Sequence, residues 1–300
     1  QPRLSFGSLL MLTILFDGIA YGMLLFILAV GLAVTMGLMN FINLAHGAFA
    51  MVGGYITVLL MQKMDVPFLL CLPLAFVGAA VLGGILERTL YRPLYHKPHL
   101  DQVLFSIGLT FMAVATATYF IGSSPQNVQL PEWLKGRTEL GEGAWMLGMG
   151  HYRLFIIAVC AALTVGLQYV LTKTRFGSRL RASVDDQRVA AGLGINVNTV
   201  FLGTFAVGSG LAGLGGALGA EVLGLDPSFP LKLMIYFLIV VAVGGTSSIT
   251  GPLLAALLLG VADVAGKYYI PKMGGFIVYS LMILILIWRP QGLFVRKGGK

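Results

Sequence analysis

Few residues of this 300-residue chain could do chemistry, and their spacing does not assemble an active site. His46 has no second metal ligand at useful spacing, and Cys71 and Cys160 form neither a C-x-x-C pair nor a metal cluster with the four histidines. Asp17 and Asp263 could carry protons if they lay at membrane depth, but both stand near the ends of apolar runs, which suits a structural role better. The sequence therefore predicts no metal site, no catalytic constellation and no cofactor in this chain.

Two glycine patterns bear on nucleotide binding. Residues 208–213 match G-x-G-x-x-G, but they lie inside a charge-free run rather than between a strand and a helix. The small residues Gly208, Ala212 and Gly216 instead predict a smooth helix face for close packing. The phosphate-binding pattern G-x-x-x-x-G-K-[ST] does not occur in the sequence, so ATP is expected to be bound and hydrolysed by a different chain.

Three polar residues, Asn40, Asn43 and His46, interrupt the charge-free stretch from Gly18 to Gln62. Polar groups buried in a membrane need partners, because an unsatisfied group there costs several kcal/mol. The pattern predicts either a broken or re-entrant segment that lines a path or acts as a hinge, or a polar turn at the cytoplasmic surface. Both interpretations fit the sequence equally.

A second interruption, Gly244–Gly251, divides the charge-free run from Leu233 to Ala262. Its hydroxyl groups can cap the exposed backbone of a helix break. Gly244, Gly245 and Ser247 are therefore candidates for another pathway or hinge element. A tight cytoplasmic turn is the preferred interpretation, and such a turn would lie beside residues 172–196.

The composition points to lipid as the solvent. Hydrophobic residues make up 57% of the chain and charged residues 11%, with a mean hydropathy of +0.89, whereas soluble domains carry about 25% charged residues. The net charge of +8 does not indicate nucleic-acid binding. The basic residues stand in short loops between apolar runs, as the positive-inside bias of membrane proteins requires.

The apolar runs predict an all-α, polytopic membrane bundle with eight or nine spans and with broken or re-entrant segments, since a helix needs about 20 apolar residues to cross a bilayer. Residues 1–300 form a single transmembrane domain on this interpretation. The predicted spans are two within Gly18–Gln62, then Val66–Leu86, Val103–Ile121, Leu154–Leu171, Thr199–Ala220, one or two within Leu233–Ala262, and Met273–Trp288.

The loops predict the orientation. Basic residues concentrate in residues 87–102, in residues 172–196 and in the tail after Trp288, so all three should be cytoplasmic. The polar segment 122–152 should be an external loop, with a short interfacial helix. A cytoplasmic C-terminus and nine crossings would place the N-terminus outside, whereas it would lie inside if one short segment does not cross.

Residues 172–196 carry five of the twenty Lys and Arg residues, and the spacing of their apolar residues is typical of a helix. Leu180, Val184 and Ala191 fall on one stripe, while charged residues occupy most of the remaining surface. A short amphipathic helix on the cytoplasmic side of a membrane protein suggests a docking surface for a soluble partner.

Three motifs in order carry a resemblance to a known family. They are Gly37–Gly47 followed by Met51–Tyr55; Thr174-Arg-Phe-Gly177 with Arg181-Ala182, Ala190-Ala191 and Gly194-Ile-Asn196; and Gly244-Gly245 with Ser247–Gly251 and the tail Arg289–Phe294. Together they resemble the LivH-like permease subunits of ABC importers for branched-chain amino acids. The resemblance covers nearly the whole chain.

The resemblance implies a bacterial inner-membrane complex that imports branched-chain or other hydrophobic amino acids. Its other parts would be a second permease, often a non-identical homologue, two cytoplasmic ATPase subunits that carry ATP-Mg, and an external or periplasmic amino-acid-binding protein. Residues 172–196, here called the coupling segment, would contact the ATPase. The coupling residues carried over from the motif are Thr174, Phe176, Gly177, Arg181, Ala182, Ala190 and Gly194.

The sequence departs from the family pattern in one respect. A Glu that often opens the related coupling motif is missing, and Asp185 and Asp186 stand nearby instead. Two alternatives remain open for the function: a permease of the same group for amides or urea, and a secondary carrier that works alone. A carrier would use carboxylates in mid-membrane, and this chain offers few.

Overall fold

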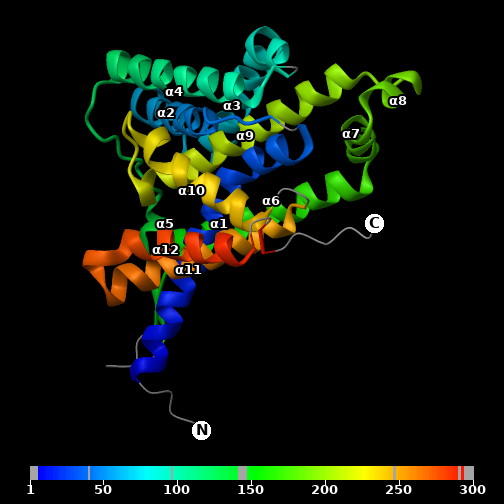
Figure 1. The fold of residues 1–300 in the computed structure, drawn as a ribbon. Helices are drawn as coiled ribbons and strands as arrows, with labels where there is room; N and C mark the ends of the chain where they lie inside the picture. The colour runs from blue at the N-terminus through cyan, green and yellow to red at the C-terminus, as the bar shows by residue number, and fades with distance from the viewer. Residues whose placement is uncertain are drawn as a thin grey trace.

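The computed structural model describes residues 6–39, 41–95, 97–140, 147–245, 248–289 and 292–293. Nearly all of these residues are helical, and the long helices lie alongside one another as a bundle (Figure 1). The predicted all-α polytopic membrane architecture is confirmed, because the helices coincide with the apolar runs of the sequence.

Nine apolar helices form the bundle in the described residues. Seven are long and apolar enough to cross a bilayer, whereas α10 and α12 have only 16 and 15 residues. The predicted eight or nine crossings therefore correspond to seven full-length helices and two shorter ones. The nine are α1 (Phe6–Met39), α2 (His46–Met64), α3 (Phe68–Leu86), α4 (His99–Ile121), α6 (His151–Lys173), α9 (Val197–Leu223), α10 (Phe229–Gly244), α11 (Thr250–Tyr269) and α12 (Gly274–Trp288).

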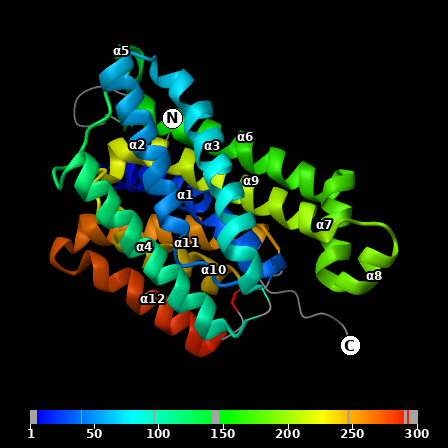
Figure 2. The same ribbon diagram turned by 90° about the horizontal axis from the view of Figure 1, so that it is seen from above.

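Helix α9 is packed against α1, α2 and α3, which approach it closely because its residues are small (Figure 2). A Cβ atom on Gly208 would lie 3.2 Å from the Cα of Gly31, and one on Gly216 would lie 1.8 Å from the carbonyl oxygen of Ala50. Ala212 is fully buried. The predicted packing face is thus confirmed. The G-x-G-x-x-G pattern lies wholly inside this helix, without the preceding strand that a dinucleotide site requires.

Helices α1 and α11 also pack backbone against backbone. A Cβ atom on Gly22 would lie 2.7 Å from the carbonyl oxygen of Ala256, and one on Gly18 would lie 2.6 Å from the Cα of Val261. The four-residue spacing of Gly18 and Gly22 puts both on one face of α1, where two helices can approach closely. The acidic residue next to this contact, Asp17, is thereby held beside α11.

The segment between α4 and α6 contains more structure than the sequence indicated. The predicted short helix is present as α5 (Glu132–Lys135), and it is followed by an antiparallel strand pair, β1 (Arg137–Leu140) and β2 (Leu147–Gly150). The backbone N–H of Gln126 donates to the carbonyl of Leu225 (2.7 Å), which ties the segment to the end of α9. The strands were missed because four residues each are too few to show alternation.

The opposite end of the bundle holds the coupling segment. Its two helices, α7 (Arg175–Asp185) and α8 (Gln187–Gly192), project from the end that lies away from α5 (Figures 1 and 2). The turns after α3, η1 (Glu87–Tyr91) and η2 (Arg92–Leu94), pack near the start of α9 at this same end. A further short turn, η4 (Pro271–Met273), precedes α12.

Candidate functional site

The coupling segment begins with a tight connection between α6 and α7. The hydroxyl of Thr174 accepts a hydrogen bond from the N–H of Gly177 (3.4 Å) and donates one to the carbonyl of Val170 (2.5 Å), which caps α7. A Cβ atom on Gly177 would lie 2.1 Å from the carbonyl oxygen of Leu171, so a larger residue would push the two helices apart. The ring of Phe176 packs toward α9. These three predicted residues hold α7 against the bundle.

Helix α8 starts anew rather than continuing α7. Asp186 has an extended backbone (φ −153°, ψ 107°), and its carboxylate accepts hydrogen bonds from the N–H groups of Arg188 (2.8 Å) and Val189 (3.0 Å). Gly194 has a φ of +81°, a conformation that favours glycine, and it follows the end of the helix. Asn196 then caps α9.

The restart at Asp186 corrects the predicted apolar stripe of the coupling segment. Leu180 is buried and Val184 is half-buried, as predicted, but Ala191 is exposed. Ala190 is buried instead, with 1% of its surface exposed. The physical reason is that an extended residue breaks the 3.6-residue period, so α8 does not continue the faces of α7. Ala190, predicted as an ATPase-contacting residue, therefore packs inside this chain and offers no side chain to a partner.

The outer surface of the coupling segment combines apolar and basic groups. Arg181 is exposed, and its guanidinium donates to the carbonyl of Leu171, while Ala182 is half-buried. Val189 is exposed, and Leu193 is 75% exposed. Sequence reasoning missed Val189 and Leu193, because the period of α7 could not indicate which residues of α8 face outward.

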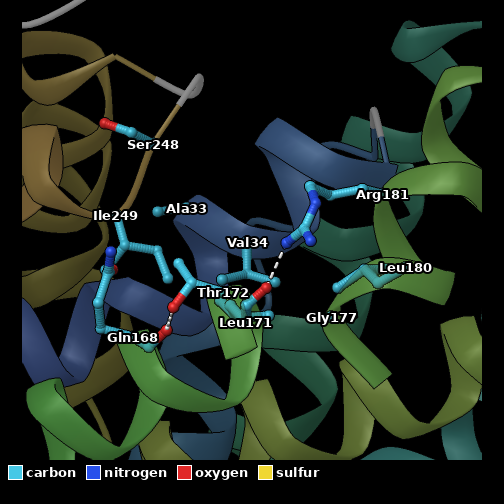
Figure 3. Close-up of a pocket in the computed structure, with 10 residues that line it drawn as sticks. All are labelled: Ala33, Val34, Gln168, Leu171, Thr172, Gly177, Leu180, Arg181, Ser248 and Ile249. Carbon is cyan, nitrogen blue, oxygen red and sulfur yellow. Dashed lines mark hydrogen bonds between the residues drawn. The ribbon is translucent and has the colours of Figure 1, made fainter. Parts of the chain in front are cut away.

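A pocket of about 210 Å³ lies where α7 meets the bundle (Figure 3). In Figure 3, Arg181 and Leu180 lie on one side of the pocket, and Ser248 and Ile249 lie on the other. Four parts of the chain thus meet here: α1, the end of α6, α7 and the connection between α10 and α11. The lining residues are Ala33, Val34, Gln168, Leu171, Thr172, Gly177, Leu180, Arg181, Ser248 and Ile249.

The second predicted interruption lies beside the coupling segment, where a tight turn would place it. Helix α10 ends at Gly244, and Gly245 follows with a φ of +79°, a conformation that favours glycine. A Cβ atom on Gly244 would lie 2.4 Å from the backbone nitrogen of Pro252, so α10 and α11 meet closely. The hydroxyl of Ser248 lies 3.0 Å from that of Thr250. The remaining candidate, Ser247, lies outside the described residues.

The first predicted interruption is a buried, non-helical break between α1 and α2. Asn43 and His46 are buried, and Asn40 lies outside the described residues. The Nε2 atom of His46 is 3.0 Å from the carbonyl oxygen of Leu28, which precedes Met39, the last residue of α1, by eleven residues. At 1.5 Å per residue, α2 therefore begins about 17 Å back along α1. This geometry favours the broken or re-entrant segment over the surface turn.

Side chains of α4 satisfy the backbone of this break. The Oε1 atom of Gln102 accepts a hydrogen bond from the N–H of Ile42 (3.2 Å), and the hydroxyl of Ser106 accepts one from the N–H of Leu44 (3.1 Å). The hydroxyl of Thr110 lies 3.4 Å from the carbonyl of Leu44. Sequence reasoning missed these three residues, although their four-residue spacing on an otherwise apolar helix is a visible signal.

An aromatic cluster joins the break to α9. The ring of Phe41 lies 5.3 Å from that of Tyr91 and 5.5 Å from that of Tyr95, both edge-on. The ring of Tyr91 in turn lies 4.7 Å from that of Phe205, and its hydroxyl donates to Oδ1 of Asn43 (3.0 Å). The break is therefore fixed on two sides, by α4 and by the turn after α3.

A buried carboxylate supports this cluster from the turn after α3. Glu87 accepts hydrogen bonds from the hydroxyl of Tyr95 (3.0 Å) and from the guanidinium of Arg92 (3.2 Å). Burial, and after it the Glu87 carboxylate, raises the pKa of Tyr95 well above its usual range.

The polar groups around the break between α1 and α2 are engaged in hydrogen bonds within the bundle. Among the described residues, no group of three or more His, Cys, Asp or Glu side chains could hold a metal ion. Cys71 and Cys160 are buried free thiols. The ring of His46 is engaged by the carbonyl of Leu28 and stands edge-on to Phe237, with 6.1 Å between ring centroids.

A family model described as "Branched-chain amino acid transport system / permease component" matches residues 14–286. The chain is similar to the high-affinity branched-chain amino acid transport system permease protein LivH of Escherichia coli (strain K12), with 27% identity over 298 residues that cover 94% of each chain. No solved structure matches the chain significantly.

Two further relatives extend this result. The permease protein BraD of Pseudomonas aeruginosa, also of a high-affinity branched-chain amino acid transport system, is 28% identical over 294 residues, covering 94% of this chain and 95% of BraD. The permease protein LivM of Escherichia coli (strain K12) is 28% identical over 294 residues, covering 90% of this chain and 68% of LivM. The chain is thus similar to two differently named permeases of one bacterium.

Proposed function

Because the chain belongs to the family of permease components of branched-chain amino acid transport systems, we propose that it imports branched-chain or other hydrophobic amino acids across the bacterial inner membrane, driven by ATP. It is a transport subunit rather than an enzyme. The names of its relatives favour such amino acids over amides or urea as ligands. A secondary carrier that works alone is not favoured, since the family is described as one component of a transport system.

The observation that carries the proposal is the position of the coupling segment. Helix α7 lines one pocket together with α1, α6 and the connection between α10 and α11. A displacement of α7 would therefore be transmitted through α1 to the break before α2. It would be transmitted directly to Ser248 and Ile249, which line the same pocket. The exposed residues Arg181, Val189 and Leu193 supply a mixed basic and apolar surface on which an ATPase could dock.

The proposed complex contains parts that this chain lacks. Two cytoplasmic ATPase subunits bind ATP-Mg, an external or periplasmic protein captures the ligand, and a second permease completes the path. Similarity to both LivH and LivM supports a second permease that is a non-identical homologue. The coupling segment and the C-terminus face the cytoplasm in this arrangement, because they carry the basic residues.

We propose that the two interruptions line the path or act as its hinge. Asn43 and His46 hold the break between α1 and α2, and Gly244 and Gly245 form the close junction of α10 with α11. Non-helical backbone at membrane depth is tolerated where protein or water satisfies it, and the α4 side chains do so here. Asn40 and Ser247 belong to the same proposal by their sequence positions.

Replacing Ala182 with Glu tests the docking surface. In proteoliposomes that contain the partner ATPase, permease and binding protein, amino-acid import should fall at least tenfold. The reason is that an unpaired carboxylate in a closed interface costs several kcal/mol, and about 1.4 kcal/mol corresponds to a factor of ten. Insertion of the chain into the membrane should be unchanged.

The matched control is Asn127→Glu, which adds the same charge to an exposed residue of the segment between α4 and α6. This variant should import at the parental rate. Leu193→Glu, on the exposed surface of the coupling segment, should behave like Ala182→Glu. Normal import by Ala182→Glu and Leu193→Glu with the partner ATPase present would show that the coupling assignment is wrong.

The purified chain by itself should neither bind nor hydrolyse ATP. The sequence has no phosphate-binding loop, and the glycine pattern at residues 208–213 is closed inside α9. Equilibrium dialysis with labelled ATP measures binding, and the complete complex with its ATPase subunits is the positive control. Saturable binding by the isolated chain would contradict the assignment as a permease component and would reopen the glycine pattern as a site.

A further inference from the structure

A second cavity, here called the outer cavity, lies at the end of the bundle away from the coupling segment and has a volume of about 200 Å³. Its wall includes the first turn of α6, the last turn of α9 and the last turns of α11. Liquid water occupies about 30 Å³ per molecule, so the space suits a single small molecule. The apolar part of its lining includes Leu24, Ile156, Val222, Leu223 and Val264.

Two ion pairs line the same cavity. Arg153 of α6 pairs with Asp17 of α1, and Lys267 pairs with Asp263 one turn earlier in α11, with 2.5 Å between Nζ and Oδ2. The close packing of α1 on α11 at Gly18 brings the two carboxylates to one cavity. The cavity therefore presents both signs of charge beside an apolar wall.

One carboxylate oxygen in the cavity is buried without a partner. The side chain of Asp263 is 2% exposed, and its Oδ1 atom has no hydrogen-bond partner among the described residues. The phenols of Tyr21 and Tyr236 lie near the Asp263 carboxylate, and the phenol of Tyr236 is close enough to interact with it as a hydrogen-bond donor. A carboxylate oxygen accepts hydrogen bonds only, so a ligand group that binds Oδ1 must be a donor.

The opposite charge is available at Arg153. Its side chain is about half exposed, and the ion pair with Asp17 uses the terminal nitrogen Nη1. A guanidinium has five N–H donors in a planar fork that matches the geometry of a carboxylate. Arg153 can therefore hold Asp17 and still bind a second carboxylate that enters the cavity.

We infer that the outer cavity binds one free amino acid with an apolar side chain. Its ammonium group donates to Oδ1 of Asp263, its carboxylate binds Arg153, and its side chain packs on the apolar wall. A zwitterion is the ligand that presents both charges on adjacent carbons next to an apolar group. The inference rests on the proposed function for the direction of transport, and it adds a site on this chain that receives the ligand before the path opens.

Cysteine protection tests the site directly. Val264 lines the cavity and is half-buried, and the native thiols of Cys71 and Cys160 are buried, so Val264→Cys supplies the reporter. The assembled complex is reconstituted without the binding protein and labelled with a water-soluble methanethiosulfonate. Leucine should slow the labelling of Val264→Cys at least fivefold. Ser124→Cys, an exposed position in the segment between α4 and α6, should label equally with and without leucine.

Two leucine analogues test the charge requirement. Leucinamide lacks the carboxylate, and 4-methylpentanoate lacks the ammonium group, so neither should protect Val264→Cys at concentrations where leucine does. Equal protection by all three compounds would show that binding in the cavity does not require the charged groups of the ligand, and this would overturn the inference. An absence of protection by leucine up to millimolar concentrations would overturn it as well.

Two variants separate ligand binding from a purely structural clamp. Asp263→Asn, in the Val264→Cys background, should lose the protection by leucine while the complex is recovered in normal amounts. The exchange Asp17→Arg with Arg153→Asp keeps an ion pair between α1 and α6 but reverses its direction. Full protection in the exchanged protein, or in Asp263→Asn, would show that the charges only hold helices together.

Import measured in parallel distinguishes the inference from the proposed function. If the complete complex imports leucine but leucine never protects Val264→Cys, the inference fails and the proposed function stands. If leucine protects but no amino acid is imported with ATP and the binding protein, the proposed function fails while the amino-acid site remains.

Discussion

Replacing Gly216 with Leu is expected to reduce the amount of folded complex recovered from membranes at least tenfold. A single Cβ atom at this position would lie 1.8 Å from the carbonyl oxygen of Ala50, so α9 and α2 would have to separate. Overpacking a core by a few methylene groups costs about 1–3 kcal/mol. Here the obstacle is backbone rather than a flexible side chain, so we expect at least about 3 kcal/mol. Size-exclusion chromatography of the detergent extract measures the recovery.

Gly166→Leu is the matched control, because nothing lies within 4 Å of a Cβ atom at this position of α6. Its recovery should equal that of the parent. The ligand preference of whatever Gly216→Leu protein still transports should be unchanged, since the residue is placed in packing. Normal recovery together with an altered ligand preference would show that this face of α9 lines the path instead.

Replacing Gln102 with Leu should destabilise the protein by roughly 3 kcal/mol or more. The amide accepts from Ile42 and also donates to the carbonyls of Leu94 (3.3 Å) and Lys97 (3.2 Å), so three backbone groups lose their partner. Each unsatisfied buried group costs about 1–3 kcal/mol. At about 2–4 °C per kcal/mol for a large domain, the unfolding midpoint in detergent should fall by roughly 6–12 °C.

Gln126→Leu provides the comparison. The side-chain amide of Gln126 donates to the carbonyl of Ser124 within its own loop, so its loss should shift the midpoint by less than about 2 °C. Import by Gln102→Leu should also fall, because the break between α1 and α2 loses its support. Equal midpoints for Gln102→Leu and the parent would mean that α4 does not hold the break.

The membrane architecture followed from local properties of the chain. Apolar runs of sufficient length have one stable state in lipid, the helix that satisfies its own backbone, so the spans could be placed from composition alone. The basic segments predicted that residues 87–102 and the coupling segment lie at the same end of the bundle. The structure agrees, because Tyr95 packs near the start of α9, directly after the coupling segment. The small residues at Gly208, Ala212 and Gly216 also predicted close helix packing, because the size of a side chain is known from the sequence alone.

Only the structure shows which residues of the coupling segment are buried and which face outward. The spacing of hydrophobic residues predicts an apolar stripe only within one continuous helix. The extended backbone at Asp186 ends α7, so the spacing no longer applies to α8. Ala190 rather than Ala191 is therefore buried, and Leu193 becomes part of the outer surface. The capping ability of Asp186 was visible in the sequence, but its consequence for the rotation of α8 was not.

Only the tertiary structure decided how the polar break before α2 is satisfied and which charges meet in the outer cavity. Gln102 and Ser106 bond to backbone groups 60 and 62 residues away, and Arg153 meets Asp17 across two helices. Sequence patterns report which groups need partners, because burial and charge are local properties. The choice of partner depends on the depth and rotation at which helices pack. The close contacts at Gly18 and Gly22 set these for α1 against α11, and the contact at Gly216 sets them for α9 against α2.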